Sequence, residues 1–513
     1  MTDKKYMKSI LLIIVGIVFH YSAYSQVVVY PGPAGEPAST DYKVELNNNN
    51  LFVYQARVSA MAVNVWPCTV RPIEQSEIAS FCSFDIEKEV TIKVYSKTKI
   101  KTVIIRPQSL NIKPVVNGNT ISFKVTKPCQ FVVEVNGLHK ALHLFANPIE
   151  KTTYNKSGKN VLYFGPGIHY PGTIRPKNNQ TIYIAAGAVV HGNIYAYKVN
   201  NLKIVGRGIL DASTLVRDVD SLTILQLEQC QKVSIEGIIL RDSHIWTLLA
   251  HECNDVEIDN IKIIGMWRYN ADGIDIVNTK NVKIQNCFVR AFDDCIVMKG
   301  INNFYWAQHN PDWDAKTQSN VSNVVVKNCV IWNDWGRALE IGAETMADSI
   351  KHVLYQNIDI IHYVNIAMDI QNGNRANVSN VTYDNIRVEE PITNAYWDGG
   401  DSLIKDLDQE IKLHGNAHKL KVDQVGCLFE INVRDNGWVK DVRYGTVNNI
   451  VFKNIRYSSL NYIPTSLFEG YSPEHEIKNI TFQNIYINGI KISDVSKANF
   501  SINEFVKNLY FKE

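Results

Sequence analysis

The stretch Asn281-Val282-Lys283-Ile284-Gln285-Asn286-Cys287 decides the fold, because it returns further along the chain as Asn323-Val324-Val325-Val326-Lys327-Asn328-Cys329. In each copy a short apolar run alternates with polar residues, which is the pattern of a half-buried β-strand. Related runs recur at intervals of about 23 to 31 residues, with a few longer gaps, and they lack helical periodicity. They begin at Asn201, Lys232, Asp255, Asn281, Asn323, His352, Asn380, Asn449 and Asn479. The chain therefore consists largely of internal repeats, each built around one such strand.

Most of these repeats carry an asparagine directly after the strand. The residues at this place are Gly206, Gly237, Asn260, Asn286, Asn328, Asn357, Asn385, Asn454 and Asn484. Asparagine tolerates the left-handed backbone of a tight turn, and stacked asparagines can hydrogen-bond the neighbours above and below them. Repeats of this length, made of short strands, are typical of a parallel β-solenoid. We therefore predict an all-β fold in which residues 150–513 form a right-handed parallel β-helix.

The region 26–149 has a different pattern. Its strand-like runs are separated by Asn117-Gly118 and Asn136-Gly137, and such pairs are favoured at tight hairpin turns. This predicts an antiparallel β-sandwich domain in front of the solenoid.

Residues 1–25 have the features of a signal peptide. A lysine-rich start precedes an apolar run from Ile10 to Phe19, and Ala23-Tyr24-Ser25 offers small residues for cleavage before Gln26. The apolar run is short for a membrane span and no second one follows, so we predict no span in the mature chain. The expected location is secreted or periplasmic.

Composition excludes some classes of partner. The chain has 53 basic and 51 acidic residues, with a formal net charge of +2 and no basic stripe, so no nucleic acid partner is predicted. Its 9 cysteines include no Cys-x-x-Cys pair, and neither a metal site nor a cofactor is predicted. Cys230 with Cys253, and Cys287 with Cys329, occupy equivalent repeat positions, which predicts stacked, buried thiols. No feature indicates an oligomer, and we predict a monomer.

Three aspartates fall at one place on consecutive repeats. Asp272 lies in Asn270-Ala271-Asp272-Gly273-Ile274-Asp275-Ile276, and Asp293 and Asp294 lie one repeat later in Phe292-Asp293-Asp294-Cys295-Ile296-Val297-Met298. Neighbouring strands are about 4.8 Å apart, and carboxylates that close repel one another unless one holds a proton. Hydrolysis of a glycosidic bond needs one protonated and one ionised carboxyl. We therefore predict that Asp272, Asp293 and Asp294 are catalytic, with a calcium site or a structural turn as the alternative.

Other polar side chains are predicted to share this face. The segment Gly336-Arg337-Ala338-Leu339-Glu340-Ile341-Gly342 places Arg337 in register with Asp294, and Ala367-Met368-Asp369-Ile370 continues the strand on the next coil. The predicted substrate-binding residues are Arg337, Lys299, Asp275, Glu340, Asp369 and Trp267. For Arg337, a structural pairing with Asp275 or Glu340 is an equal alternative.

These motifs resemble those of glycoside hydrolase family 28, the polygalacturonases and their relatives. The segments around Asp272, around Asp293-Asp294 and from Gly336 to Gly342 correspond to the Asn-Thr-Asp, Asp-Asp and Gly-His-Gly motifs of that family. The resemblance implies an inverting hydrolase, in which Asp293 is the general acid and Asp272 and Asp294 activate water. It covers roughly residues 163–482.

The chain departs from the family pattern at two places. Arg337 replaces the histidine of Gly-His-Gly, and Ala367-Met368-Asp369 replaces the Arg-Ile-Lys triplet that grips the galacturonate carboxylate. The N-terminal sandwich is similar in layout to the family 49 dextranases. The first interpretation is therefore a polygalacturonase-like hydrolase of a pectin-type polysaccharide, with a neutral glucan as the alternative substrate. A β-helix polysaccharide lyase and a non-catalytic glycan-binding solenoid are the other interpretations.

Overall fold

The computed structural model describes residues 27–60, 71, 73–152, 154, 157–217, 219–301, 320–392, 426–435, 443–459 and 462–512. The predicted signal peptide, residues 1–25, lies outside the described residues. Short 3-10 helices span Ile73–Gln75 (η1), Gln108–Leu110 (η2) and Val495–Lys497 (η5). Within the described part, no helix is long and apolar enough to cross a membrane.

Two sheets at the start of the chain pack face to face. One has the order β1-β5-β11-β10-β7, with β4 paired to β5, and the other has the order β3-β2-β6-β9-β8. The strands are β1 (Val27–Val29), β2 (Tyr42–Leu46), β3 (Asn49–Leu51), β4 (Tyr54–Ser59), β5 (Ser76–Ile86), β6 (Val90–Ser96), β7 (Val103–Arg106), β8 (Val115–Asn117), β9 (Thr120–Val125), β10 (Cys129–Val135) and β11 (Leu142–Pro148). Alternate side chains of both sheets, Val44 and Ile92 from one and Phe84 and Leu144 from the other, share a core.

The predicted hairpins form in this sandwich. Strands β8 and β9 pair antiparallel across Gly118, and β10 and β11 pair antiparallel across Asn136-Gly137. One pair differs from the prediction, because β11 runs parallel to β5. The parallel pair arises because β5 and β11 are joined by the intervening strands of both sheets and not by a hairpin.

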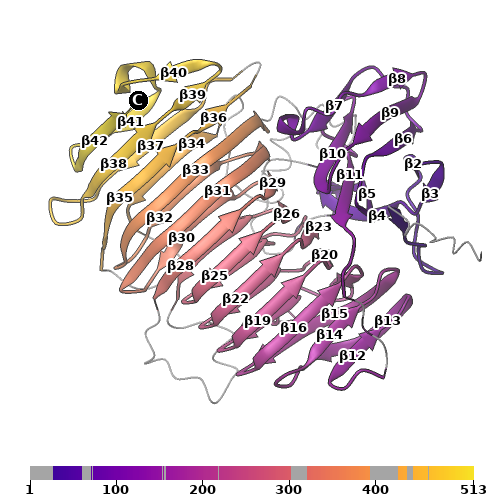
Figure 1. Ribbon diagram of the computed structural model, residues 1–513. Helices are drawn as coiled ribbons and strands as arrows, with labels where there is room; N and C mark the ends of the chain where they lie inside the picture. Colours follow the sequence, from indigo (N-terminus) through magenta and orange to yellow (C-terminus); the bar gives the residue numbers. More distant parts are fainter. Residues whose placement is uncertain are drawn as a thin grey trace, which may run out of the picture.

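The rest of the described chain, β12 to β42, forms one 31-stranded coil, shown from magenta to yellow in Figure 1. Its strands pair in parallel, apart from the antiparallel pair of β39 and β40. Strands of successive coils stack in three columns, which we name by what they carry. The asparagine face contains β12 (Val161–Phe164), β14 (Thr181–Ile184), β16 (Asn200–Gly206), β19 (Gln231–Glu236), β22 (Asn254–Asp259), β25 (Lys280–Gln285), β28 (Val321–Lys327), β35 (Thr446–Lys453), β38 (Ile477–Gln483) and β42 (Val506–Lys512).

The second and third columns complete each coil. The sandwich-side face contains β13 (Gly167–Ile174), β17 (Ile209–Asp211), β20 (Ile239–Arg241), β23 (Lys262–Ile264), β26 (Phe288–Ala291), β29 (Val330–Asn333), β36 (Arg456–Tyr457), β39 (Ile485–Ile487) and β40 (Ile490–Ile492). The carboxylate face contains β18 (Leu225–Glu228), β21 (Leu248–His251), β24 (Ile274–Val277), β27 (Ile296–Gly300), β30 (Arg337–Thr345), β32 (Ile366–Asn372), β34 (Cys427–Val433), β37 (Thr465–Glu469) and β41 (Phe500–Ile502). Strands β15 (Ala188–Tyr197), β31 (Ser349–Tyr363) and β33 (Asn377–Pro391) bend across two faces, and so does β13, which pairs along both parts of β15.

The asparagine ladder forms as predicted. Asn260, Asn286, Asn328, Asn357, Asn385, Asn454 and Asn484 all have a positive φ, between 52° and 57°. The amide of Asn357 donates to Asn328 Oδ1 over 2.8 Å, and the amide of Asn385 donates to Asn357 Oδ1 over 3.2 Å. A second ladder, which we did not predict, runs at the start of the same strands, where Asn323 donates to Asn281 over 2.9 Å.

Apolar side chains from all three faces fill the interior of the coil. Aromatic rings stack along part of this core, with centroid distances of 4.7 Å between Tyr355 and Tyr383 and 5.0 Å between Tyr383 and Phe452. The four cysteines predicted to be stacked are buried free thiols. The fold class predicted from sequence, an all-β parallel β-helix behind a β-sandwich, is confirmed.

The sandwich packs along the β-helix and not at its end (Figure 1). Phe81, Val132 and Phe145 of the sandwich share one apolar cluster with Ile209, Ile239, Phe288 and Trp332 of the sandwich-side face. Buried ion pairs cross the same interface, such as Arg207 with Asp85 at 3.2 Å and Arg106 with Glu389 at 2.6 Å. The predicted boundary at residues 149–150 falls between β11 and β12. The sandwich and the β-helix on its two sides share an apolar cluster.

Candidate active site

The predicted register on the carboxylate face is present. Asp275 pairs with Val297, Val297 with Glu340, and Glu340 with Asp369 on successive coils. The alternate residues of the same strands, among them Ile274, Ile296 and Leu339, point into the apolar core. Because side chains alternate across a strand, the polar members of this column face outward from the coil.

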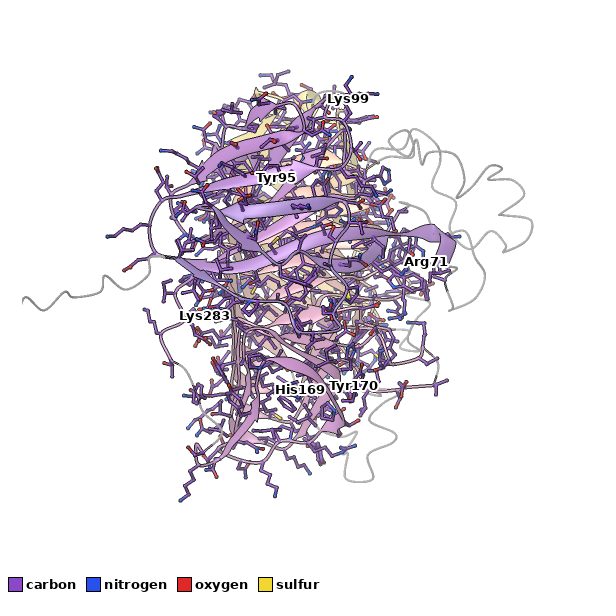
Figure 2. The ribbon with its side chains drawn as sticks, turned by 90° about the vertical axis from the view of Figure 1, so that its right-hand side faces the viewer. Arg71, Tyr95, Lys99, His169, Tyr170 and Lys283 are labelled. Atoms are coloured by element: carbon purple, nitrogen blue, oxygen red, sulfur yellow. The ribbon has the colours of Figure 1, made fainter. Side chains whose placement is uncertain are left out.

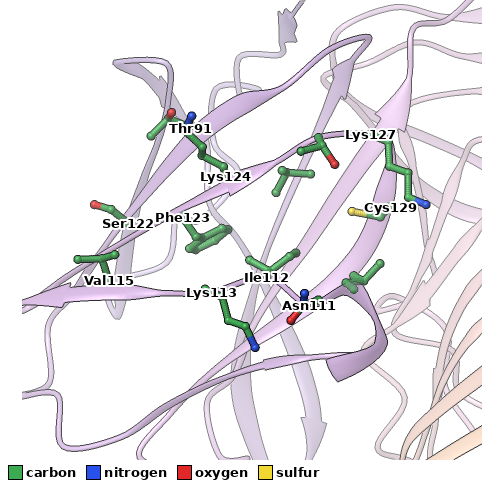
Figure 3. Close-up of a pocket in the computed structure, with 13 residues that line it drawn as sticks. Thr91, Asn111, Ile112, Lys113, Val115, Ser122, Phe123, Lys124, Lys127 and Cys129 are labelled. Carbon is green, nitrogen blue, oxygen red and sulfur yellow. The ribbon is translucent and has the colours of Figure 1, made fainter.

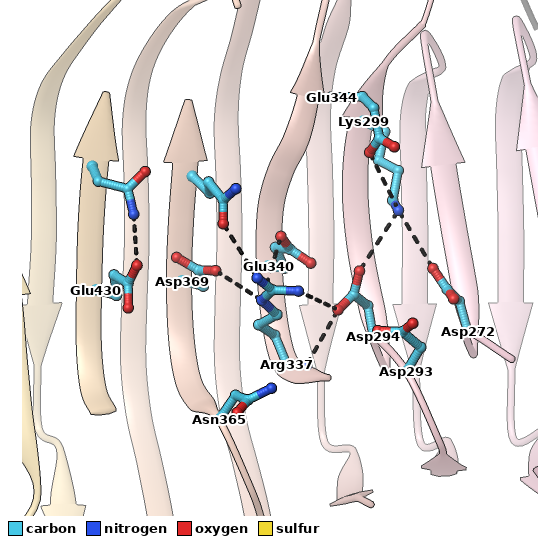
Figure 4. A network of polar contacts seen from close by, with 12 residues as sticks. Asp272, Asp293, Asp294, Lys299, Arg337, Glu340, Glu344, Asn365, Asp369 and Glu430 are labelled. Atoms are coloured by element: carbon cyan, nitrogen blue, oxygen red, sulfur yellow. Dashed lines mark hydrogen bonds and ion pairs between the residues drawn. The ribbon is translucent and has the colours of Figure 1, made fainter. Parts of the chain in front are cut away.

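The three candidate catalytic aspartates lie just before strands β24 and β27, at the edge of the carboxylate face (Figure 4). Backbone hydrogen bonds fix them to one another across the coils. The Asp293 amide donates to the carbonyl of Ala271 over 3.2 Å, and the Gly273 amide donates to the carbonyl of Asp294 over 2.8 Å. Asp272, Asp293 and Asp294 are 1%, 8% and 5% exposed, so all three carboxyls are taken out of bulk water.

Lys299 on β27 is surrounded by carboxylates. Its Nζ lies 3.4 Å from Asp272, 3.6 Å from Asp294, 3.5 Å from Glu344 and 3.9 Å from Asp275. The ammonium also lies over the ring of Trp246, 4.4 Å from its centroid. Although burial disfavours the charged form, these carboxylates raise the pKa of Lys299 well above its ordinary value. The predicted substrate-binding lysine therefore contacts two of the candidate catalytic carboxylates, and its ammonium is held within the protein.

The three aspartates have different electrostatic surroundings. Burial raises the pKa of Asp272 to about 7, with Lys299 opposing this shift and Asp294 adding to it. Burial and the neighbouring Asp294 and Asp272 raise the pKa of Asp293 well above its ordinary value. Burial acts on Asp294 too, but Lys299 and Arg337 outweigh it and hold its pKa below the ordinary value. Within the described residues no ion pair includes Asp293.

Arg337 forms a second centre of charge on the next coils. Its guanidinium lies 3.8 Å from Asp294, 4.0 Å from Glu340 and 3.5 Å from Asp369, and it donates to Gln371 Oε1 over 3.3 Å. Its backbone amide also donates to Asp294 Oδ1 over 3.2 Å. Arg337 pairs with carboxylates, as a structural role requires, and 24% of its side chain is exposed, as contact with a substrate requires. The structure is therefore compatible with both roles.

Glu340 and Asp369 are fully buried acids on this face. Burial raises the pKa of both well above the ordinary value, with Asp294 adding to the shift at Glu340 and Glu430 adding to it at Asp369. In the described part of the chain, none of their four carboxylate oxygens receives a hydrogen bond. Asp275 has the same feature, with both oxygens buried and without a hydrogen bond from a described residue. Such groups can accept hydrogen bonds from a bound molecule.

Trp267 is the predicted residue that lies apart from the cluster. It is 8% exposed, its indole N–H donates to Asp242 Oδ1 over 3.0 Å, and Arg268 lies 5.1 Å from its ring centroid. Its ring is therefore packed against the protein, and the predicted role in binding substrate stays a prediction.

Several residues of the site were not predicted. Glu344 and Trp246 contact Lys299, Glu430 follows Asp369 in the outward column, and Asn333 donates to the carbonyl of Asp293 over 2.7 Å. Glu430 is the one that the repeat pattern could have found, since Cys427–Val433 alternates like the preceding strands. Trp246 lies in a turn, Glu344 near the end of β30 beside a register shift, and Asn333 at the end of β29, and the repeat does not specify the geometry of these places.

One hollow on the sandwich lies away from the candidate active site. It has a volume of about 560 Å³ and lies among Leu110, Ile112, Val115, Phe123 and Cys129, with Lys113, Lys124 and Lys127 at its rim (Figure 3). None of the predicted site residues lines it. In the described part of the chain, no group of three or more histidine, cysteine or acidic side chains has an arrangement that could hold a metal ion.

The fold and the carboxylate cluster place the chain among the parallel β-helix proteins that present acidic side chains on one face. Residues 192–396, which contain all the predicted site residues, match the model of Glycosyl hydrolases family 28. The resemblance predicted from the motifs is therefore confirmed over these residues.

Individual relatives agree with this match. The chain is 27% identical over 225 residues to the probable exopolygalacturonase B of Aspergillus terreus, covering 41% of this chain and 45% of that protein. It is 22% identical over 319 residues to a polygalacturonase of Juniperus ashei, covering 54% of this chain and 58% of that protein. The chain thus spans about half the length of these relatives.

One solved structure is similar over nearly the whole chain. Dex49A from Penicillium minioluteum has a TM-score of 0.60 and 15% identity, covering 93% of this chain and 96% of the other. At this identity the likeness supports the fold alone.

Proposed function

We propose that the protein is a secreted or periplasmic glycoside hydrolase that cleaves a polysaccharide with inversion of configuration. The observation that carries this proposal is that, within the described part of the chain, two of the three neighbouring aspartates contact a cation and the third, Asp293, does not. Lys299 contacts Asp272 and Asp294, and Arg337 contacts Asp294, whereas Asp293 has neighbouring carboxylates and no ion pair among the described residues. One proton shared by this cluster is therefore held most favourably by Asp293.

In the proposed reaction, Asp293 donates its proton to the glycosidic oxygen as the bond to the anomeric carbon breaks. A water molecule attacks that carbon from the opposite side of the ring and gives its proton to Asp294 or Asp272. Inverting enzymes hold their acid and base carboxyls about 6.5–9.5 Å apart to admit this water. Lys299 stabilises the ionised bases before the reaction, so little reorganisation is needed when charge moves.

For the substrate, the family match and its polygalacturonase relatives support a pectin-type glycan. The same relatives make a polymer the expected substrate. Arg337, Glu340, Asp369 and Asp275 are proposed to contact the sugar, because they lie beside the aspartates on the same face.

A neutral glucan is the second candidate, and one observation favours it. Asp369 stands where a cation would be needed for a uronate, and neither it nor Glu340 receives a hydrogen bond from a described residue. Hydroxyl groups can hydrogen-bond to such carboxyls in either protonation state, whereas neither state supplies the positive charge that favours a uronate. Arg337 and Lys299 offer little compensation, because both already contact several carboxylates.

Reducing-sugar release by the mature protein tests the proposal. The substrates are polygalacturonan, the same polymer after reduction of its carboxyl groups, and dextran, with Asp293→Asn as the inactive variant. Exposed Asp255 provides the matched control Asp255→Asn. Release from one substrate that Asp293→Asn abolishes and Asp255→Asn leaves intact supports the hydrolase, and NMR of the first product shows whether the configuration inverts. Products with ultraviolet absorbance would instead show a lyase, and equal behaviour of both variants would reject the catalytic role.

A further inference from the structure

Arg71 is a buried arginine of the sandwich that contacts residues beside the candidate catalytic aspartates. It lies just before η1, at one edge of the sandwich in Figure 2, and is 3% exposed. Its Nη1 donates to the carbonyl of Trp267 over 2.8 Å, and its guanidinium carbon lies 4.2 Å from the ring centroid of Phe292. Arg71 also donates to the side chain and the carbonyl of Gln75 over 3.2 Å and 3.1 Å, which anchor it to its own segment.

Both contacted residues belong to the turns that carry the aspartates. Trp267 starts the turn that leads to Asp272, and the amide of Ala271 closes this turn on the carbonyl of Arg268 over 3.2 Å. Phe292 directly precedes Asp293, and its ring stacks on Trp335 with a centroid distance of 5.4 Å and an interplanar angle of 18°. Trp335 in turn precedes Gly336 and Arg337. One guanidinium thus contacts the Asp272 turn and the Asp293 turn, and through Phe292 it reaches the Arg337 turn.

Burying this cation has a cost that the surroundings must offset. Burial lowers the pKa of Arg71 to about 9, although the nearby Asp334 opposes the shift. A guanidinium is planar and presents several donors in a fixed geometry, so it can hold a carbonyl and lie over a ring at the same time. A lysine or an apolar side chain of similar length could make only part of these contacts.

We propose that Arg71 is a positioning residue for the aspartates on the turns that it contacts, so that the sandwich is a working part of the active site and not a detachable glycan-binding module. The proposal rests on the proposed function for its activity readout, since Arg71 acts through Trp267 and Phe292 and not on the substrate. A shift of about 1 Å in catalytic groups can lower the rate about a hundredfold. Arg71→Met should therefore lower kcat by about tenfold to a hundredfold with little change in KM.

The test uses the full mature chain and a matched control at the same interface. Arg207→Met removes a buried arginine that joins the β-helix to Asp85 of the sandwich, away from Trp267 and Phe292. Hydrogen exchange is measured by mass spectrometry on peptides covering 266–275 and 290–297. These contain the amides of Ala271 and Asp293, which donate to the carbonyls of Arg268 and Ala271. We expect faster exchange in both peptides for Arg71→Met and unchanged exchange there for Arg207→Met.

Two further variants complete the test. Arg71→Lys keeps the charge and should fold if Arg71→Met does not, with the same acceleration in weaker form. Arg71→Ala should recover part of its lost kcat when millimolar guanidinium is added, and a purely structural role would give no such rescue. Unchanged exchange in both peptides, or equal effects of Arg71→Met and Arg207→Met, would overturn the inference. If the parent chain hydrolyses no glycan, the proposed function fails, and the exchange data still decide the role of Arg71.

Discussion

Gly336 lies against Asp293 with no room for a side chain between them. A Cβ atom on Gly336 would come within 2.6 Å of the carbonyl carbon of Asp293 and closer still to its Oδ1. The Gly336 amide also donates to the carbonyl of Phe292 over 3.1 Å, which brings the two turns together. The glycine that begins the Gly336–Gly342 motif is thus required by the position of the proposed acid on the preceding coil.

Gly336→Ala should therefore displace Asp293 and lower kcat by about a hundredfold or more. Gly118→Ala is the control, because Gly118 lies in a sandwich turn with nothing within 4 Å of its Cβ position. Its positive φ of 60° predicts a stability loss of about 1–2 kcal/mol without loss of activity. Steady-state kinetics and thermal unfolding of both variants separate the two effects, and full activity of Gly336→Ala would contradict the proposed site.

Lys299→Met should move the acidic limb of the pH–activity profile to higher pH. The base must be ionised to act, and Lys299 lowers the pKa of both Asp272 and Asp294. Without the ammonium both pKa values rise, so the base stays protonated up to a higher pH and kcat at lower pH falls. The profile of kcat against pH checks this, with Lys283→Met as the control at an exposed lysine on the asparagine face. An unshifted acidic limb would mean that Lys299 does not act on the base.

Asp369→Asn should change the choice between charged and neutral substrates. Asparagine cannot ionise and adds an amide N–H that can donate to a uronate carboxylate, so the ratio of kcat/KM for polygalacturonan to that for its carboxyl-reduced form should rise several-fold. The comparison of the two polymers cancels general damage to the enzyme, because both have the same backbone. A ratio that stays constant would place Asp369 outside the substrate contacts.

Glu134 should make stability depend on acid pH. It is buried between His362 and Arg106, at 2.5 Å and 3.0 Å, and although burial opposes this, the two partners lower its pKa from 4.5 to about 2. A lowered folded-state pKa contributes stability above pH 4.5, which is lost as the pH falls towards 2. Thermal unfolding between pH 2 and 7 should therefore show a smaller acid dependence in Glu134→Gln than in the parent protein. An equal acid dependence would show that this carboxylate is not the group responsible.

At Asn357, the contribution of the asparagine ladder to the free energy of unfolding should separate into a backbone part and a side-chain part. Asn357→Ala loses the amide bonds to Asn328 and Asn385 and also strains a residue with φ of 54°, whereas Asn357→Gly loses only the bonds. We expect a loss of about 2–3 kcal/mol for alanine and about 1 kcal/mol for glycine. Denaturant unfolding of the two variants measures the difference, and equal losses would assign the ladder to hydrogen bonding alone.

Much of this architecture could be predicted because the repeat imposes one geometry many times. The asparagines after most strands favoured a left-handed turn, and aligning Asp272 with Asp294 through their flanking apolar residues placed the outward column correctly. The contacts of Lys299 could not be predicted in this way. They depend on Glu344 and Trp246, which lie at a bulge and in a turn where the repeat is interrupted. The parallel pairing of β5 and β11 was missed for a related reason, since local hairpin signals contain no information about distant strands.

The sandwich also sets a length on the coil beside it. Asp85 and Arg106 belong to the sandwich, and their partners Arg207 and Glu389 lie on early and late coils. Each coil added between these partners would shift Glu389 by about 4.8 Å along the axis, beyond the reach of Arg106. The β-helix can therefore gain or lose whole repeats after β33 while keeping these ion pairs. Between Arg207 and Glu389, however, the two ion pairs to the sandwich fix the number of repeats.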